Sequence, residues 1–319
     1  MKALRTIGVG LVGIVLLQFA AGCASAKDKS GRTDELKVLM IGNSFSISCL
    51  KHLPKVALAC GVDLDLASLY IGGCSMKRHW ENIQKAETNS CFRPYRFDLY
   101  RNGGESVKKA ARNIQEALKS ERWDVVTIQQ ASHESINTDT FSPYGENLVK
   151  TIRRHAPQAK IVLQETWSYT PWDKRLAKWK IDQDEMYRRL HAAYGEFASR
   201  HGFEVIPMGT AVQEWRKRLP VKYTENSFGG DVAGGGGQSP RDQFKRDGKN
   251  AWVPNCDVFH LNPRGTYFQA LVWAASLFKG VDVSACPYKP ADVTDDEAKL
   301  MREIAVELAK RIRIGLRTD

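Results

Sequence analysis

The stretch LKVLMIGNSF, at residues 36–45, decides the fold predicted for this chain. An apolar run over residues 36–41 passes directly into Gly42-Asn43-Ser44, which is typical of a buried strand that ends in a tight turn. Downstream of this turn, strand-like and helix-like stretches alternate. The sequence therefore predicts an α/β fold of the flavodoxin-like kind, a three-layer α/β/α sandwich with a mostly parallel central sheet.

The other elements are predicted from the spacing of apolar residues and from the residues that bound each run. Further strands are expected over residues 64–71, 124–129, 160–165 and 203–206. Helices are expected over residues 50–60, 107–118, 145–154, 182–200, 263–278 and 295–314. Asn262 is expected to cap the helix that Pro263 begins. A glycine-rich stretch at residues 226–250 interrupts the alternation, and we expect either a solvated insertion or a lid.

The N-terminal residues have the composition of an export signal. Lys2 and Arg5 precede an apolar run over residues 7–21, which is short for a membrane span. Small residues then precede Cys23, as in bacterial lipoprotein signals that are cleaved before a lipid-bearing cysteine. An ordinary signal cleaved near residues 24–26, or an uncleaved anchor, is the alternative.

The domain organisation follows from this leader. We expect a signal over residues 1–22, a lipid anchor on Cys23, a tether over residues 23–36 and a single domain over residues 37–319. The protein would then be exported and held on a membrane of the cell envelope by its lipid. Ala24 favours the outer membrane if the host is Gram-negative.

Composition limits the classes of function. With 43% hydrophobic and 26% charged residues, the chain is expected to fold around a core. Its net charge of +11 falls only to +9 when Lys2 and Arg5 are removed, and no basic run or nucleic-acid motif is present, so a nucleic-acid partner is not expected. Six cysteines besides Cys23 permit disulfides, but their pairing and the oligomeric state cannot be read from the sequence.

Three residues could carry nucleophilic chemistry. A serine hydroxyl becomes a strong nucleophile when an imidazole accepts its proton and a carboxylate orients that imidazole. Ser44 follows a predicted strand, which places its oxygen at the carboxyl edge of the sheet. Asp257 and His260 are three residues apart and can face the same side. Taken separately, the serine could be a helix cap, and the Asp-His pair could belong to an ordinary loop.

Two sequence blocks resemble the SGNH/GDSL hydrolases. IGNSFS at residues 41–46 looks like the first block of that family, and DVFHLN at residues 257–262 resembles the last, with its D-x-x-H spacing. The resemblance spans residues 38–280 and implies an α/β/α hydrolase. The resemblance implies that Ser44 is the nucleophile, that His260 is the base and that Asp257 is the partner of His260. It implies no metal or organic cofactor.

Two further segments resemble an uncharacterised bacterial subgroup of SGNH-like proteins. They are WDVVTIQQ at residues 123–130 and DEMY at residues 184–187. In the first block, Asn43 replaces the usual aspartate, at a position that supports the turn.

The resemblance also implies an oxyanion hole, formed by the serine N–H, a glycine N–H and an asparagine side chain. Gly73, at the end of the second strand, is preferred over Gly72 for the glycine. No Gly-x-Asn-Asp follows the third strand. Alignment by position selects His133 and side-chain chemistry selects Gln130, so Gln130 is the first choice and His133 the second.

Glu165 and Trp167, at the end of the fourth strand, are expected to face the same edge and to contact substrate, or else to be packing residues. The expected reaction is hydrolysis of a carboxylic ester, an acetyl group on a carbohydrate, with a small-molecule or polysaccharide ester as the partner. Export, anchoring and the tendency of the family suggest the carbohydrate. A lipid or lysophospholipid esterase and a non-catalytic binding lipoprotein are the alternatives.

Overall fold

The computed structural model describes residues 35–101, 103, 106–219, 221–236, 239 and 241–311. The expected signal, nearly all of the expected tether, and the lipid-anchor candidate Cys23 lie outside these residues. No helix within the described ranges is long and apolar enough to span a membrane.

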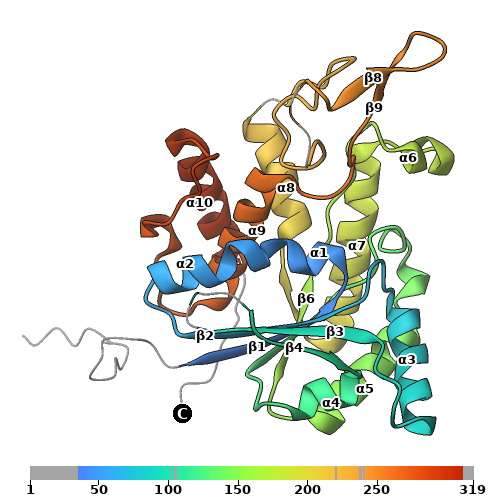
Figure 1. Cartoon of the computed structure of the whole chain (residues 1–319), viewed down its shortest axis with the longest axis vertical. Coiled ribbons are helices and arrows are strands. Elements are labelled where there is room, and N and C mark those ends of the chain that lie inside the picture. The colour runs from blue at the N-terminus through green and yellow to red at the C-terminus, as the bar shows by residue number, and fades with distance from the viewer. Residues whose placement is uncertain are drawn as a thin grey trace, which may run out of the picture.

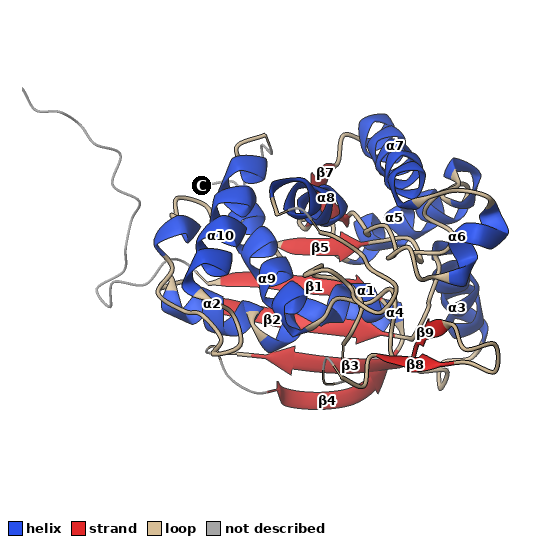
Figure 2. Cartoon of the chain, turned by 90° about the horizontal axis from the view of Figure 1, so that it is seen from above, coloured by secondary structure: helices blue, strands red, loops and turns tan. Residues whose placement is uncertain are grey.

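A seven-stranded sheet in the order β4-β3-β2-β1-β5-β6-β7 forms the middle layer. Its strands are β1 Leu36–Gly42, β2 Leu64–Tyr70, β3 Tyr95–Tyr100, β4 Ser106–Arg112, β5 Val125–Ile128, β6 Lys160–Gln164 and β7 Glu204–Ile206. The neighbouring pairs β2-β1, β1-β5, β5-β6 and β6-β7 are parallel. At the other edge, β3 pairs antiparallel with both β2 and β4. Figure 2 shows β5, β1, β2, β3 and β4 side by side in that order.

Helices cover both faces of this sheet, which confirms the predicted three-layer fold (Figure 1). Because side chains alternate along a strand, Val38 and Met40 of β1 pack into one apolar cluster, and Leu39 and Ile41 pack into the other. The first cluster includes residues of α2 Leu53–Ala59, α8 Met208–Arg218, α9 Pro263–Leu277 and α10 Asp295–Ala309. The second includes residues of α3 Met76–Thr88, α4 Ile114–Lys119 and α5 Tyr144–His155, and α7 Gln183–His201 contributes to both.

Most of the strands and helices predicted from the sequence occur where expected, within a few residues. The Asn262 side chain accepts a hydrogen bond from the Gly265 N–H at 3.0 Å, so it caps α9 as predicted, with Pro263 as the first helical residue. The final helix α10 ends at Ala309, and the predicted continuation over residues 312–314 lies outside the described residues.

The predicted helix over residues 107–118 is wrong in its first half. Residues 106–112 form β4, which pairs with β3, a strand that the sequence did not reveal. The helix α4 begins only after Asn113, whose side chain accepts a hydrogen bond from the Glu116 N–H at 2.8 Å in a capping box. Pairing with β3 outweighs the helical propensity of the Lys-Lys-Ala-Ala stretch.

Candidate active site

The turn after β1 places Ser44 at the carboxyl edge of the sheet, as the first residue of α1 Ser44–Ile47. The Asn43 side chain accepts a hydrogen bond from the Phe45 N–H at 3.0 Å and donates one to the Cys74 carbonyl at 3.0 Å. A Cβ atom at Gly42 would lie 2.5 Å from the Ser46 hydroxyl oxygen, so the turn requires glycine there. Asn43 therefore supports the serine turn, while the Ser44 side chain is half-buried.

Ser44, His260 and Asp257 form a continuous hydrogen-bonded chain. The Ser44 Oγ lies 2.7 Å from the His260 Nε2, and the His260 Nδ1 lies 2.5 Å from the Asp257 Oδ2. Ser44 and His260 are 216 positions apart in the sequence, so only the fold brings them together. With the proton on Nδ1, the free Nε2 can accept the proton of the serine hydroxyl.

Asp257 is held in its charged form by the loop that carries it. Its Oδ1 accepts the N–H groups of Phe259 at 2.9 Å and His260 at 2.8 Å. Partial burial alone would raise the pKa of Asp257, but the hydrogen bonds from the His260 ring and from these two N–H groups lower it to about 2. The side chains of His260 and Asp257 are 30% and 32% exposed, so solvent and a substrate can reach the pair.

Trp167 lies beneath the site rather than on its surface. The indole is fully buried, stacks on the Phe45 ring at 4.1 Å between centroids, and donates its Nε1–H to the Phe259 carbonyl at 2.8 Å. It therefore joins the serine turn to the loop of His260. Because the side chain of Trp167 is 0% exposed, its position fits the packing role given as the alternative and leaves no surface of the ring open to a substrate.

Glu165 also belongs to the interior. Its Oε1 lies 2.7 Å from the His191 Nδ1, and its Oε2 accepts the Thr210 N–H at 2.7 Å. The carboxylate is 1% exposed and joins α7 to the start of α8. The expected role of Glu165 in substrate binding is therefore not supported by its position, because both oxygens are engaged with these helices.

The glycine-rich insertion braces the loop of His260. The Gly234 N–H donates to the His260 carbonyl at 2.8 Å, and the Gly235 N–H donates to the Asp257 carbonyl at 2.9 Å. Both glycines have positive φ, of 76° and 73°, a conformation that other residues rarely adopt. This support was not predicted from the sequence, although the run of glycines at residues 234–237 is a signal for unusual backbone geometry.

A buried ion pair anchors the brace. Arg216 of α8 lies 2.9 Å from Asp231, and their side chains are 5% and 0% exposed. The Tyr223 hydroxyl donates to the same carboxylate at 2.5 Å. The Asp231 carbonyl accepts a hydrogen bond from the Asn262 side chain at 2.7 Å, two residues after His260. The insertion is thus tied to α8 through Arg216, and to the loop that carries Asp257 and His260.

Gly73 occupies a turn that is attached to the serine turn. The Cys74 N–H donates to the Ile71 carbonyl at 3.3 Å, and Gly73 between them has φ of 59°. The Ile71 N–H donates to the Gly42 carbonyl at 3.4 Å, which keeps this turn beside the end of β1. Gly73 is exposed at the carboxyl end of β2, a position compatible with an oxyanion-hole donor.

Gln130, the first choice for the third oxyanion donor, is fully buried and bonded elsewhere. Its Oε1 accepts the N–H groups of Met76 at 2.9 Å and Ala131 at 2.8 Å, and its Nε2 donates to the Thr140 carbonyl at 2.8 Å. The amide therefore orders the loop after β5 and has no donor directed to the site. His133, the second choice, has a 45% exposed side chain in the same loop, with its Nε2 3.6 Å from a Glu134 carboxylate oxygen.

Gln129 is a functional neighbour that the sequence analysis missed. Its Nε2 donates to the Asn43 Oδ1 at 2.7 Å, which fixes the orientation of the Asn43 amide. The sequence signal for this role was the polar end of the third predicted strand, at residues 124–129.

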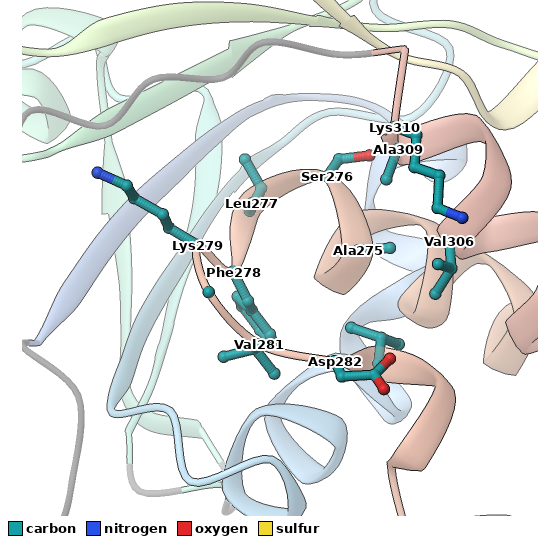
Figure 3. A pocket seen from close by; sticks show the side chains of 12 residues that line it. Ala275, Ser276, Leu277, Phe278, Lys279, Val281, Asp282, Val306, Ala309 and Lys310 are labelled. Carbon is teal, nitrogen blue, oxygen red and sulfur yellow. The ribbon is translucent and has the colours of Figure 1, made fainter. Parts of the chain in front are cut away.

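A depression of about 300 Å³ lies beside the triad. Besides Asp257 and His260, it is lined by Lys51, Gly236, Leu261, Pro263 and Thr266. A second depression, of about 290 Å³, lies between the end of α9 and α10 and shares no lining residue with the first (Figure 3).

A family model described as a domain of unknown function, DUF4886, matches residues 37–231, which is more than half of the chain. The chain belongs to the DUF4886 family. The match includes Ser44 and both segments that resemble the uncharacterised SGNH-like subgroup, and it ends before Asp257 and His260. The sequence-based resemblance to such a subgroup is therefore confirmed. No curated protein matches the chain.

The DUF4886 chain is similar to a solved DUF4886 protein from Bacteroides uniformis, with 27% identity and a TM-score of 0.69 over 86% of this chain and 94% of that one. It is also similar to a putative SGNH hydrolase from Slackia heliotrinireducens, with 20% identity, a TM-score of 0.44 and coverage of 76% and 98%. An acetyl xylan esterase shares 14% identity, with a TM-score of 0.43 and coverage of 75% and 99%. Because both of these TM-scores are below 0.5, the activities named for those two proteins are not assigned to this chain.

Proposed function

We propose that this protein is a serine esterase of the SGNH type, which hydrolyses carboxylic esters through Ser44, His260 and Asp257. The observation that carries the proposal is the chain of two short contacts from the Ser44 Oγ through the His260 imidazole to the Asp257 carboxylate. The serine lies at the carboxyl edge of the sheet, and the other two residues lie in a braced loop above it.

In the first half of the reaction, the Ser44 Oγ attacks the ester carbonyl while its proton passes to the His260 Nε2. Asp257, charged at neutral pH, stabilises the imidazolium that forms. The N–H groups of Ser44 and Gly73 donate to the developing oxyanion. His260 then gives its proton to the departing alcohol, which leaves an acyl group on Ser44.

In the second half, His260 takes a proton from water, and the resulting nucleophile attacks the acyl-enzyme. The intermediate collapses, the serine oxygen recovers its proton from His260, and the acid is released.

The substrate is proposed to carry a small acyl group, acetyl, on a polar alcohol such as a sugar. Leu261 and Pro263 contribute to the accessible lining of the depression beside His260, which is mostly apolar, and Lys51 and Thr266 add polar groups to it. A space of about 300 Å³ suits a small ester, and Lys51 and Thr266 are the groups that could bind a polar alcohol. A polymer chain would extend from there across the protein surface.

Hydrolysis of p-nitrophenyl acetate and of acetylated oligosaccharides tests the proposal, with Ser44→Ala and His260→Ala as variants. We expect turnover by the unaltered chain and a loss of at least about a thousandfold in either variant. Equal rates in all three proteins would contradict the esterase function. Asp139→Asn, at an exposed position, is the control and should retain full activity.

We also propose export and a lipid anchor on Cys23. Fractionation of expressing cells tests this, because Cys23→Ser should move the protein from the membrane to the soluble fraction. Firm membrane association of Cys23→Ser would contradict lipidation.

A further inference from the structure

The carbonyl oxygen of Phe45, the residue after the candidate nucleophile, accepts hydrogen bonds from two buried side-chain amides. The Gln269 Nε2 donates to it at 2.7 Å, and the Gln164 Nε2 donates to it at 2.8 Å. Gln164 is the last residue of β6, and Gln269 lies in the middle of α9. The turn that presents Ser44 is therefore tied through one oxygen both to the central sheet and to a helix that covers it.

The same helix carries the other partner of the proton transfer. The N-cap of α9 is Asn262, two residues after His260, and Gln269 follows about two turns further along the helix. Because a helix rises about 1.5 Å per residue, Asn262 and Gln269 are held about 10 Å apart along its axis. One helix thus holds His260 near its start and contacts the serine turn through Gln269.

Phe45 is the residue at which these contacts meet. Its backbone is one peptide away from Ser44, and its ring stacks on Trp167 and lies 5.4 Å from the His260 ring, centroid to centroid. A displacement of the Phe45 backbone would therefore move the Ser44 hydroxyl relative to the imidazole. The contacts of Asn43 described above hold the turn on the other side of the serine.

Stability alone does not account for glutamine at these two positions. Gln164 is 1% exposed and Gln269 is 0% exposed, and the neighbours of Gln269 in α9 include the buried apolar residues Phe268, Ala270 and Leu271. Neither Oε1 atom has a hydrogen-bond partner among the residues that the structure describes. A buried amide with an unpaired oxygen contributes less to stability than an apolar side chain of the same shape.

We propose that Gln269 and Gln164 are positioning residues for Ser44, and that α9 acts as a rigid spacer that sets the distance between the Ser44 Oγ and the His260 Nε2. This inference rests on the proposed esterase function. Both glutamines act through the Phe45 carbonyl and not on the substrate. Their effect is on proton transfer and attack, because a displacement of about 1 Å between reacting groups can slow a reaction a hundredfold.

A single replacement separates positioning from stability. When either amide is removed, the Phe45 carbonyl keeps the hydrogen bond from the other one. The replacement also removes a buried oxygen that lacks a partner in the described part of the chain. The melting temperature should therefore change little, while Ser44 is held less firmly against His260.

Steady-state kinetics on p-nitrophenyl acetate, together with thermal unfolding, test the inference in Gln269→Met and Gln164→Met. Methionine has a similar length and lacks the donor. We expect kcat to fall about tenfold while KM stays within about twofold. The melting temperature should stay within about 3 °C of that of the unaltered chain. Gln115→Met is the matched control and should keep the original kcat, because this half-buried amide donates to the Ile83 carbonyl on the other face of the sheet.

Two results would overturn the inference. One is an unchanged kcat in both Gln269→Met and Gln164→Met. The other is a loss of kcat that comes only with a large fall in melting temperature or with failure to fold, because the glutamines would then serve stability.

Ser44→Ala in the same assay distinguishes this outcome from failure of the esterase function. If the unaltered chain turns over the ester and Ser44→Ala does not, the glutamine variants alone decide the inference. If the unaltered chain is inactive, a crystal structure of Gln269→Met decides it. A separation of more than about 3.5 Å between the Ser44 Oγ and the His260 Nε2 would support the spacer role, since it breaks the hydrogen bond. Retention of the 2.7 Å contact would overturn it.

Discussion

Gly234 donates its backbone N–H to the carbonyl oxygen of His260 at 2.8 Å, so an insertion far in sequence from the serine turn helps to hold the residue that contacts Ser44. Gly235 makes the matching contact to Asp257. The loop that carries Asp257 and His260 is therefore held by two groups of contacts. One comes from the insertion, and the other is the hydrogen bond from the Trp167 indole to the Phe259 carbonyl.

Gly234→Ala should lower kcat by about ten- to a hundredfold and leave KM within about twofold, because a small displacement of the imidazole weakens attack more than binding. A Cβ atom here would lie 2.5 Å from the Phe228 ring, on a backbone with φ of 76°. Steady-state kinetics on p-nitrophenyl acetate provide the measurement. Gly248→Ala is the matched control, since a Cβ there meets nothing within 4 Å. An unchanged kcat in Gly234→Ala would show that the brace does not position His260.

Asp257→Asn should reduce the loss of stability that occurs in acid. The folded-state pKa of about 2 lies below the unfolded value of about 3.9, so the carboxylate stabilises the fold above about pH 4. That contribution is lost as the pH falls toward 2. Urea midpoints measured at pH 7 and pH 3 should therefore differ less in Asp257→Asn than in the unaltered chain. Asp139→Asn, an exposed control, should keep the original difference; an identical pH response in Asp257→Asn would contradict the prediction.

Gln130→Ala and His133→Ala should fail in different ways. Loss of the Gln130 amide leaves the buried N–H of Met76 without its acceptor, which costs about 1–3 kcal/mol of stability. His133→Ala removes an exposed side chain, so the melting temperature should stay nearly constant. If His133 is the third oxyanion donor, its removal lowers kcat about a hundredfold. A large kcat loss in Gln130→Ala at unchanged stability would reverse this assignment.

Trp167→Ala should destabilise the protein by about 3–5 kcal/mol, as expected when a fully buried aromatic side chain is removed from a core. Trp167→Phe retains most of the stacking on Phe45 and loses the hydrogen bond to the Phe259 carbonyl. It should lower kcat with a much smaller loss of stability. Denaturant unfolding and kinetics on both variants separate these effects. Trp252→Ala is the control, because this indole is half-buried in the hairpin of β8 Phe244–Arg246 and β9 Trp252–Pro254. If Trp252→Ala and Trp167→Ala lost the same stability, the proposed packing role of Trp167 would be contradicted.

The sequence by itself determined the layers of the fold and the identity of the groups now found in contact. Apart from Lys37, the run over residues 36–41 is apolar on both sides, because a central parallel strand is covered on both faces. Asn262 and Pro263 specified the start of α9 because capping depends on a few neighbouring residues. The same local logic led to Ser44 after a strand and to the short spacing of Asp257 and His260.

Only the tertiary structure decided which of the candidate polar groups face the site. Glu165 and Gln130 lie at strand ends as expected, but partners from distant segments, Thr210 and Met76, turn them into interior hydrogen bonders. The stretch at residues 106–112 became a strand because β3 offered it a hydrogen-bonding edge. A local pattern fixes backbone conformation, whereas the direction and pairing of a side chain depend on groups far away in the sequence, and those groups meet only when the chain is folded.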